Sequence, residues 1–331
     1  MPGNPKTRGL AVRHAAFTIL ELLVACAVLI LLMAVMLSLI DQTSVVWRNS
    51  NTRIEAFQNA RRSFDNLTAL LEQATLNTYW DYDNPNSPSR YRRQSELHFR
   101  VGPAGKDGLP GTAGTGQAVF FQAPANFTGN VSTYDGLGGL INACGFFVQY
   151  GSDVSWLPAH VNSSQARERF RLMQWMQNTE SLKVYEQTGG SWIPAAAVAA
   201  AEAVPVADNV VALVIWPREE GAPASPILNA YSYDSRWKSY SAPWESRDSA
   251  SNQLPPILQV ALVAIDESSA RRLGDALKST MDGCLSGLFV DPPSQKFTQD
   301  LKTLEARLAA QAITYRSFMS AIPMREAKWS P

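Results

Sequence analysis

The chain has 331 residues, of which 46% are hydrophobic and 18% are charged. Its 29 Lys and Arg residues balance its 29 Asp and Glu residues, so the formal net charge is zero. This balance excludes the basic footprint expected of a nucleic-acid-binding protein. The length leaves room for a membrane anchor with one large or two small further domains.

The N-terminal region combines a long apolar segment with a single acid. Residues 17–40 are almost entirely apolar but contain Glu21. As a helix they would span about 36 Å, enough to cross a hydrocarbon core of about 30 Å. A carboxylate inside such a helix costs roughly 2.5–3.5 kcal/mol, so it requires a partner. If the chain is cut between Ala16 and Phe17, the new α-amino group of Phe17 can be that partner.

The residues before the apolar segment indicate its orientation. Residues 1–16 contain Lys6, Arg8 and Arg13 but no acid. We therefore expect this short leader to stay in the cytoplasm. The protein would then be a single-pass protein of the inner membrane, with its C-terminal domain in the periplasm.

Three other signals compete with cleavage before Phe17. A secretory signal has an apolar core of about 7–15 residues, shorter than this segment. A lipoprotein signal is suggested by Leu23–Cys26, which fits its cleavage box, although the apolar run continues from Val28 to Leu37. A plain uncleaved anchor explains the length but leaves Glu21 without a partner.

Residues 16–21 resemble the type IV prepilin signal of pilins and pseudopilins, whose usual form is Gly-Phe-Thr-Leu-X-Glu. The resemblance implies cleavage by a prepilin peptidase between Ala16 and Phe17 and N-methylation of Phe17. It also implies that Glu21 sets the register of subunits during assembly. Ala16 replaces the usual Gly and Ile19 replaces the usual Leu, which predicts slower processing.

A long helix is expected to continue beyond the membrane. No Gly or Pro occurs between Phe17 and Asn84, so residues 41–84 are assigned to the exported part of that helix. The acid-, amide- and proline-rich segment 81–88 would end it as a turn. Oxygen ligands in this turn could bind Ca²⁺, but the segment lacks EF-hand spacing and a plain loop is the simpler interpretation. The apolar residues that recur at helical spacings are Val46, Phe57, Phe64, Leu67 and Leu71.

Residues 85–331 are predicted to form an α+β domain. Gly-X-Y triplets over residues 102–116 are too few for collagen and predict a mobile surface loop. Residues 217–256 form a long irregular excursion rich in proline. Strands are expected at 96–101, 118–121, 144–150, 169–175, 209–216, 257–265 and 315–322, and short helices at 195–203 and 297–308. The predicted fold is pilin-like, with the N-terminal helix packed on antiparallel sheet and long loop insertions.

Several exported segments are similar to Verru_Chthon cassette protein C, a group of prepilin-type proteins. These segments are 171–173, 209–218, 254–267 and 327–330. A late strand that follows Leu-Pro-Pro is also similar to J-type minor pseudopilins of type II secretion. The resemblance implies a minor pseudopilin near the tip of a periplasmic pseudopilus. Its partners would be other minor pseudopilins and the inner-membrane assembly platform.

No motif for catalysis, a cofactor or a metal is apparent in the sequence. His14, His98 and His160 are far apart, and the alternating pattern around His98 favours a surface position. We therefore expect a protein that is not an enzyme. The alternative is a membrane-tethered exported enzyme or binding domain that uses a prepilin-type signal.

Three further features are left open by the sequence. Cys144 and Cys284 lie in the exported part, where they either form a disulfide or remain buried thiols. Residues 266–267 are acidic and favour a helix start, because acids interact well with the positive end of the helix dipole. Aromatic residues gather at 231–244, either as an interface or as a cover for the core.

Overall fold

A computed structural model describes residues 18–84, 86–134, 136–157, 160–162, 166–185, 192–218, 230–236, 251–291 and 297–327. The chain divides into two units, residues 1–51 and 52–331, and each is described by itself. Ala16 and Phe17, the residues predicted to flank the cleavage, lie outside the described residues.

The first unit contains an exposed apolar helix. The helix α1 (Ile19–Glu72) begins here, and its stretch Ile19–Ser44 has 26 residues, within which an 18-residue window reaches a mean hydropathy of 3.1. A helix of that length spans about 39 Å. It is therefore long and apolar enough to cross a membrane, as a single-pass anchor requires.

The helix α1 ends at Glu72 rather than at Asn84, so the predicted ectodomain helix is too long. Beyond Glu72, Thr75 donates its backbone N–H to the carbonyl of Gln122 at 2.9 Å. The side chain of Asn77 accepts two backbone N–H groups, each at 3.0 Å. Thr and Asn have low helix propensity because their side chains compete for backbone hydrogen bonds. These residues end the helix near Glu72 although the segment up to Asn84 contains neither Gly nor Pro.

The larger sheet of the second unit has six antiparallel strands in the order β7-β6-β5-β4-β3-β9. They are β3 (Arg100–Pro103), β4 (Gln117–Pro124), β5 (Ile141–Ser152), β6 (Glu168–Gln177), β7 (Val204–Asp208) and β9 (Tyr233–Asp234). Every residue of β4 except Pro124 is buried. Strands covered on both faces read as continuous apolar runs, which is why the sequence indicated β4 and β5.

A second sheet has three antiparallel strands in the order β11-β10-β8. They are β8 (Val210–Arg218), β10 (Ile257–Ile265) and β11 (Tyr315–Pro323). An isolated β-bridge joins Gly116, the residue before β4, to Leu213 of β8. A Cβ atom at Gly116 would lie 2.0 Å from the carbonyl oxygen of Leu213, so only glycine fits there.

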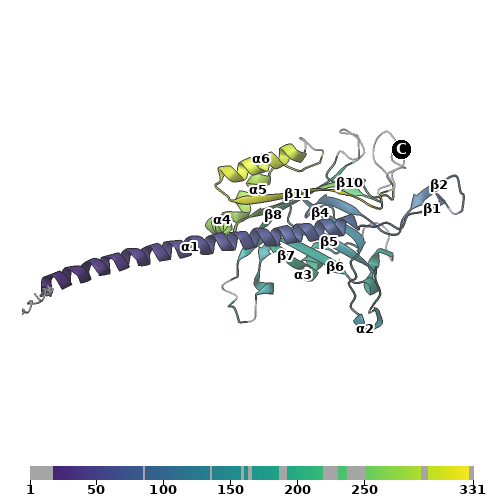
Figure 1. The fold of residues 1–331 in the computed structure, drawn as a ribbon. Helices are drawn as coiled ribbons and strands as arrows, with labels where there is room; N and C mark the ends of the chain where they lie inside the picture. The colour runs from purple at the N-terminus through teal and green to yellow at the C-terminus, as the bar shows by residue number, and fades with distance from the viewer. Residues whose placement is uncertain are drawn as a thin grey trace, which may run out of the picture. The chain divides into compact units, whose positions relative to one another are not determined.

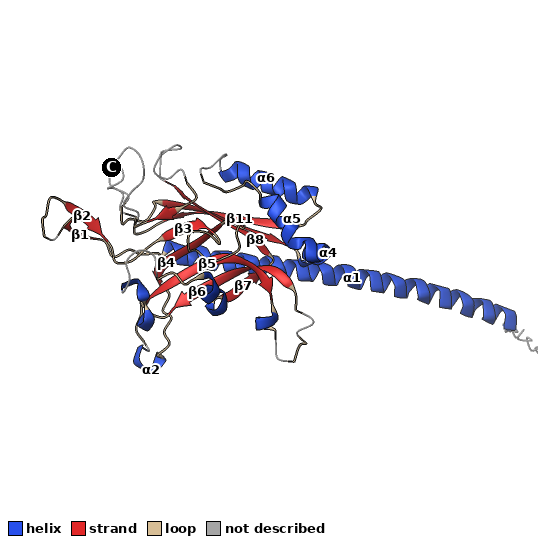
Figure 2. Cartoon of the chain, turned by 180° about the vertical axis from the view of Figure 1, so that it is seen from behind, coloured by secondary structure: helices blue, strands red, loops and turns tan. Residues whose placement is uncertain are grey.

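The part of α1 that belongs to the second unit packs on both sheets (Figures 1 and 2). Phe64 stacks on Phe318 of β11 with ring centroids 6.0 Å apart. Ser63 Oγ donates a hydrogen bond to the carbonyl of Val206 in β7 at 2.7 Å. The buried side chains of this helical face are Ala60, Phe64, Leu67 and Leu71. The predicted apolar stripe is therefore confirmed from residue 57 onward.

Three helices lie beside the three-stranded sheet (Figure 1). They are α4 (Glu267–Leu273), α5 (Leu277–Leu285) and α6 (Phe297–Ala310). Trp216 of β8 stacks on Phe297 with centroids 5.8 Å apart. The guanidinium group of Arg307 donates to the carbonyls of Cys284 and Ser286 at 2.9 and 2.8 Å, which satisfies the end of α5.

The remaining elements are short. The helix α3 (Ala196–Glu202) lies beside the larger sheet, and α2 (Val131–Tyr134) lies at the end of a connection that extends away from it (Figure 1). The helix α3 confirms the prediction for residues 195–203. The strands β1 (Tyr79–Tyr82) and β2 (Tyr91–Gln94) form a separate two-stranded sheet.

Two predictions for the region before β4 are wrong. The strand expected at residues 96–101 begins only at Arg100. Leu97, His98 and Phe99 are all buried, which the alternation of a half-buried strand does not allow. Residues 102–116 are only in part a surface loop, because Ala104, Leu109 and Thr115 are buried whereas residues 105–108 and 113–114 are exposed.

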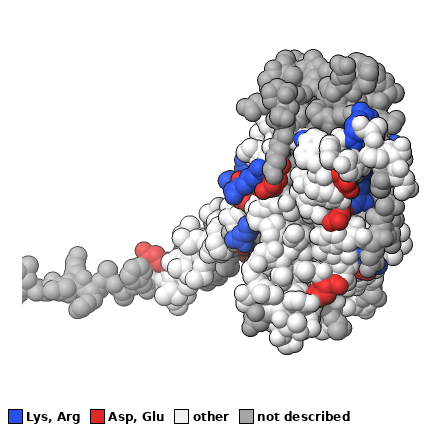
Figure 3. Space-filling model, turned by 90° about the vertical axis from the view of Figure 1, so that its right-hand side faces the viewer, with Lys and Arg blue, Asp and Glu red and all other residues white. Residues whose placement is uncertain are grey.

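The surface of the second unit carries mixed charges. On the face shown in Figure 3, Lys and Arg side chains lie beside Asp and Glu side chains. The described residues of this face form no continuous basic patch. The distribution agrees with the balanced composition of the chain.

Candidate functional site

Thr18 and Glu21 form a reciprocal cap at the start of α1. The backbone N–H of Thr18 donates to the Glu21 carboxylate at 3.4 Å, and the backbone N–H of Glu21 donates to Thr18 Oγ1 at 3.3 Å. This arrangement is a capping box, which satisfies two N–H groups that have no partner within the helix. It places the Glu21 carboxylate at the positive end of the helix dipole.

The capping box changes the interpretation of Glu21. We expected an uncleaved anchor to leave this carboxylate without a partner, but Thr18 provides one. That expectation was wrong, and the signal that could have corrected it was the Thr-X-X-Glu spacing. A carboxylate has about four acceptor positions, so Glu21 keeps capacity for one further cation.

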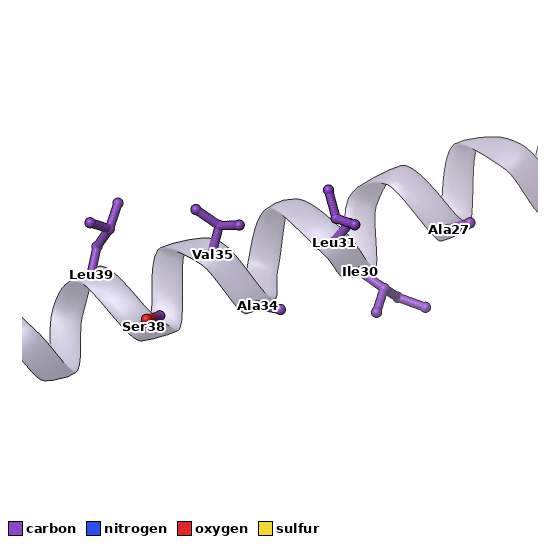
Figure 4. Close-up of a pocket in the computed structure, with 7 residues that line it drawn as sticks. All are labelled: Ala27, Ile30, Leu31, Ala34, Val35, Ser38 and Leu39. Atoms are coloured by element: carbon purple, nitrogen blue, oxygen red, sulfur yellow. The ribbon is translucent and has the colours of Figure 1, made fainter.

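One face of the anchor helix carries the small side chains of Ala27, Ala34 and Ser38 among larger apolar ones (Figure 4). Ala34 and Ser38 are four residues apart, the spacing that lets two helices approach closely in a membrane. The hydroxyl of Ser38 also accepts a hydrogen bond from the Gln42 side chain at 3.3 Å. The residues of this face are Ala27, Ile30, Leu31, Ala34, Val35, Ser38 and Leu39. The face is shallow and apolar, so it suits the side of another helix.

The cysteines of the ectodomain are free. Cys144 in β5 and Cys284 in α5 are both buried and unbonded. Burial raises the pKa of the Cys144 thiol to about 12 and raises that of Cys284. Since the thiolate is the reactive form, neither side chain is a nucleophile at neutral pH. The structure corresponds to the buried-thiol alternative and not to a disulfide.

His98 is buried, which corrects the predicted surface position; its side chain is 1% exposed. His98 Nε2 lies 2.7 Å from Asp234 Oδ1, and His98 Nδ1 lies 2.9 Å from the indole nitrogen of Trp192. An indole N–H is only a donor, so Nδ1 is the acceptor and Nε2 carries the proton. We call these three residues the His98 cluster.

The His98 cluster contains a neutral ring and an ionised acid. Burial lowers the pKa of His98 although Asp234 opposes this shift. Burial alone would raise the pKa of Asp234, but the hydrogen bond from His98 brings it below its ordinary value. Both imidazole nitrogens are engaged, which leaves no position for a metal or a substrate. The cluster therefore links three segments that are distant in sequence.

A second polar cluster, the arginine network, lies along β6 and the start of α4. It consists of Asp153, Arg167, Arg169, Arg171, Asp208, Glu267 and Arg271. Arg171 is 4% exposed, and its guanidinium nitrogen Nε lies 3.2 Å from Asp208 Oδ1. The guanidinium carbon of Arg171 also lies 5.3 Å from the ring centroid of Trp156. Sequence reasoning missed this network because its members are far apart in the chain.

The acidic pair at residues 266–267 starts a helix, as predicted. The Asp266 side chain accepts the backbone N–H of Ser269 at 3.0 Å and caps α4. The Glu267 carboxylate accepts hydrogen bonds from Asn209 and Arg271, both at 2.8 Å. Burial would raise the pKa of Glu267, but these hydrogen bonds and the nearby guanidinium groups lower it. Glu267 is thus an ionised member of the arginine network.

The turn considered for Ca²⁺ is satisfied by its own chain. The hydroxyl of Ser89 and three backbone N–H groups donate to the Asp83 carboxylate. These hydrogen bonds, above all that from Ser89, hold the pKa of Asp83 far below its usual value. Among the described residues, no group of three or more His, Cys, Asp or Glu side chains could hold a metal ion.

The aromatic cluster expected at residues 231–244 is divided. Tyr231 and Tyr233 are buried and belong to the core. Tyr231 donates its hydroxyl to Asp300 at 3.1 Å, and burial raises its pKa. The other aromatic residues of this group, Trp237, Tyr240 and Trp244, lie outside the described residues, so the choice between an interface and a cover for the core stays open for them. A different exposed aromatic group, which the sequence did not reveal, lies on β1 and β2.

Comparison with known protein families, characterised proteins and solved structures found no match to this chain. The function is therefore argued from the residues of the chain itself. The strongest of these are Glu21 and the apolar helix that follows it.

Proposed function

We propose that this chain is a minor pseudopilin of a type II secretion or type IV pilus-like system. Residues 17–40 hold it in the inner membrane, prepilin peptidase cuts it between Ala16 and Phe17, and it joins a periplasmic pseudopilus near the tip. The observation that carries the proposal is Glu21, a carboxylate at the start of a helix that is otherwise apolar as far as Ile40.

The capping geometry is compatible with this role. After cleavage, Thr18 would be the second residue and could still donate to Glu21. The unused acceptor positions of the carboxylate would receive the α-amino group of Phe17 from a neighbouring subunit. Amine and carboxylate attract each other more strongly in an apolar helix bundle than in water. The small-residue face around Ala34 and Ser38 would allow the helices of such a bundle to approach closely.

The size of the ectodomain supports a position near the tip. Residues 85–331 would have a compact radius of gyration of about 18 Å. Such a bulky domain would clash if it were repeated along a tightly wound fibre. At the tip, few subunits lie above it. The partners would be other minor pseudopilins and the assembly platform of the inner membrane.

Processing is tested on the full chain extracted from the membranes of its native cells. We expect the mature chain to begin at Phe17 with a methylated amine, as seen by N-terminal sequencing and intact mass. A chain that still begins at Met1 would indicate a plain anchor. A chain that begins at Cys26 with a lipid adduct would indicate a lipoprotein. Either result would overturn the proposal.

The charge of Glu21 is tested by two substitutions at the same position. A glutamine at this position still completes a capping box, whereas an alanine does not. If Glu21 pairs with an amine, both Glu21→Gln and Glu21→Ala should insert in the membrane but lose co-assembly with other prepilin-type subunits. If Glu21 acts only as a cap, Glu21→Gln should co-assemble normally, which would contradict the proposal. Asp41→Asn is the matched control, because it removes an acid outside the cap.

A further inference from the structure

The strand β11 is an outer strand of the three-stranded sheet, where β10 is its neighbour on one side. At the two ends of this pairing, Met324 donates its backbone N–H to the carbonyl of Pro256 at 2.9 Å, and the carbonyl of Thr314 accepts the backbone N–H of Asp266 at 3.0 Å. Both residues on the β11 side have even numbers, and bonded positions alternate along an antiparallel pair. The odd-numbered residues of β11 therefore direct their N–H and C=O groups away from β10. These residues are Tyr315, Ser317, Met319 and Ala321.

The outward backbone groups of β11 form no hydrogen bond within the part of the chain that the structure describes. Its two faces are used by helices: Phe318 stacks on Phe64 of α1, and the hydroxyl of Ser317 donates to Glu305 of α6 at 2.5 Å. Met319 is 59% exposed. The helices thus contact the faces of the strand, and its outer edge stays unpaired.

The strand β7, at one end of the larger sheet, is protected in ways that β11 is not. It has five residues, contains Pro205 and pairs with β6 in an irregular register. The hydroxyl of Ser63 also donates to its Val206 carbonyl. Short length, proline, bulges and covering elements keep an edge from pairing with other chains. By contrast, β11 has nine residues in a continuous register with β10, and its proline is only the last residue, Pro323.

The unpaired row defines the chemistry of what can cover it. An extended strand presents N–H and C=O groups at the same spacing, so it can satisfy the whole row, as in β-strand addition. A helix cannot, because its backbone groups are bonded to one another. Lipid is excluded as well, since it offers no hydrogen-bonding partner to an open sheet edge.

The direction of α1 argues against a second copy of this chain as the partner. Phe57 lies 5.9 Å from the guanidinium carbon of Arg316 near the start of β11, and Glu72 binds Arg325 just beyond its end. This part of α1 and β11 therefore run in the same direction. Two copies paired antiparallel along β11 would direct the N-terminal ends of these α1 segments oppositely. The anchors precede those ends in the chain, so the two anchors would not meet one membrane.

We propose that the outer edge of β11 adds an extended strand from a different protein of the same compartment. The added strand exchanges backbone hydrogen bonds with residues 315–321. Its alternate side chains lie beside Met319 and Ala321, where small or apolar residues fit. This inference does not depend on the proposed pseudopilin function, since a tethered binding domain could use the same edge.

The capacity of the edge is tested with a synthetic peptide of residues 315–323, YRSFMSAIP. The peptide has no anchor, so it can pair antiparallel with β11 of the full chain, Met319 opposite Met319. We expect saturable binding to the full chain in detergent, measured by fluorescence anisotropy. N-methylation should weaken binding about tenfold at one of two neighbouring peptide amides, Met319 or Ser320, and less than about twofold at the other. The reason is that alternate amides of an added strand face opposite sides. No binding, or equal effects, would overturn the proposal.

Two substitutions at position 319 of the full chain separate backbone from side chain. Met319→Pro removes an outward N–H but no bond to β10, so the domain should keep its circular dichroism and bind the peptide about tenfold more weakly. Met319→Ala keeps the N–H and should bind within about threefold of the unaltered chain. Equal weakening by both would show a side-chain contact and overturn the proposal. If Met319→Pro does not fold, the methylated peptides still decide.

The natural partner is identified with p-benzoylphenylalanine at position 321 of the full chain in its native cells. A control chain carries the probe at Val290, which is 48% exposed and lies after α5. Irradiation should join position 321, but not position 290, to one segment of one other protein. A synthetic peptide of that segment should bind the full chain, depend on alternate amides and lose about tenfold with Met319→Pro. A segment without these properties would overturn the proposal. So would a cross-link to a second copy, to the chain itself or to lipid, or none at all.

Discussion

The His98 cluster and the arginine network differ in how they hold ionisable side chains within the ectodomain. Both place charged groups inside the ectodomain, but His98 is 1% exposed, whereas Glu267 is 16% and Asp208 is 55% exposed. In the His98 cluster, the neutral ring has two partners, and the Asp234 carboxylate also accepts the backbone N–H of Arg236 at 2.8 Å and lies 3.7 Å from the Arg100 guanidinium group. The arginine network shares three acids among several guanidinium groups. Removal of one side chain should therefore destabilise the His98 cluster more than the arginine network, in which neighbouring guanidinium groups remain.

Removal of the His98 side chain should have the largest effect. His98→Ala leaves a cavity and a buried indole N–H without its acceptor, and it removes the imidazole donor of Asp234, which keeps Arg100 and the backbone N–H of Arg236. We expect a loss of about 3–4 kcal/mol in the free energy of unfolding. Denaturant titration of the full chain in detergent measures it. The matched control is His160→Ala, an exposed histidine whose loss should change stability by less than about 0.5 kcal/mol.

Removal of a cation from the arginine network should lower the free energy of unfolding by less than removal of the His98 side chain. Arg171→Met keeps a long apolar side chain over Trp156 but leaves Asp208 and Asp153 with fewer partners. Because Arg169 still contacts both acids, we expect a loss of about 2 kcal/mol, below that of an isolated buried pair. Arg167→Met removes a half-exposed cation and should cost less than about 0.5 kcal/mol. Equal losses of stability in Arg171→Met and Arg167→Met would contradict the distinction between buried and exposed cations of the network.

Acidification should distinguish the two clusters further. The folded-state pKa of His98 is lowered, so the unfolded chain takes up a proton first as the pH falls below about 6.5. Stability should therefore decline between pH 7 and pH 5, by at most about 1.4 kcal/mol per pH unit. The lowered pKa values of Asp234 and Glu267 act only near or below their ordinary values, at more acidic pH. His98→Gln, which can still contact both partners, should lack this decline.

Added salt should change the free energy of unfolding least. Of the two clusters, only the arginine network should respond to it. Exposed charge pairs are screened at 1 M salt, whereas buried hydrogen bonds are not. We expect a loss below about 1 kcal/mol in the unaltered chain and a smaller loss in Glu267→Gln. The His98→Gln variant should respond as the unaltered chain does. A larger salt effect through His98 would show that its cluster is accessible to solvent.

The sequence predicted the elements whose signals are local. The strand β10 has the predicted bounds because it is an apolar run, interrupted only by Gln259, between Pro256 and the helix cap Asp266. The helix α6 was predicted from its apolar spacing. The end of α1 was missed because Asn77 contacts residues that follow the hairpin, about twenty positions away. Propensity alone does not include such a contact.

The polar clusters could not be predicted for the same reason. His98 and Asp234 are separated by 136 positions, so the sequence pattern around His98 says nothing about its partner. The capping box of Glu21 was within reach, because its two members are three residues apart. The exposed aromatic residues of β1 and β2 are visible in the sequence, but that they share one side of the hairpin depends on the pairing register of the two strands. Cleavage before Phe17 stays a prediction.

The contact of α1 with β11 has a consequence for the order of folding. Phe64 lies in the first element of the second unit and Phe318 in the last strand of the described chain. Arg325 and Glu72, which also join the two regions, are 253 positions apart. Contacts of such long range form late, because the chain between them must first be ordered. During synthesis, the part of the α1 face that packs on β11 therefore stays uncovered until almost the whole chain has emerged. The first helix of the domain is covered there by the last strand.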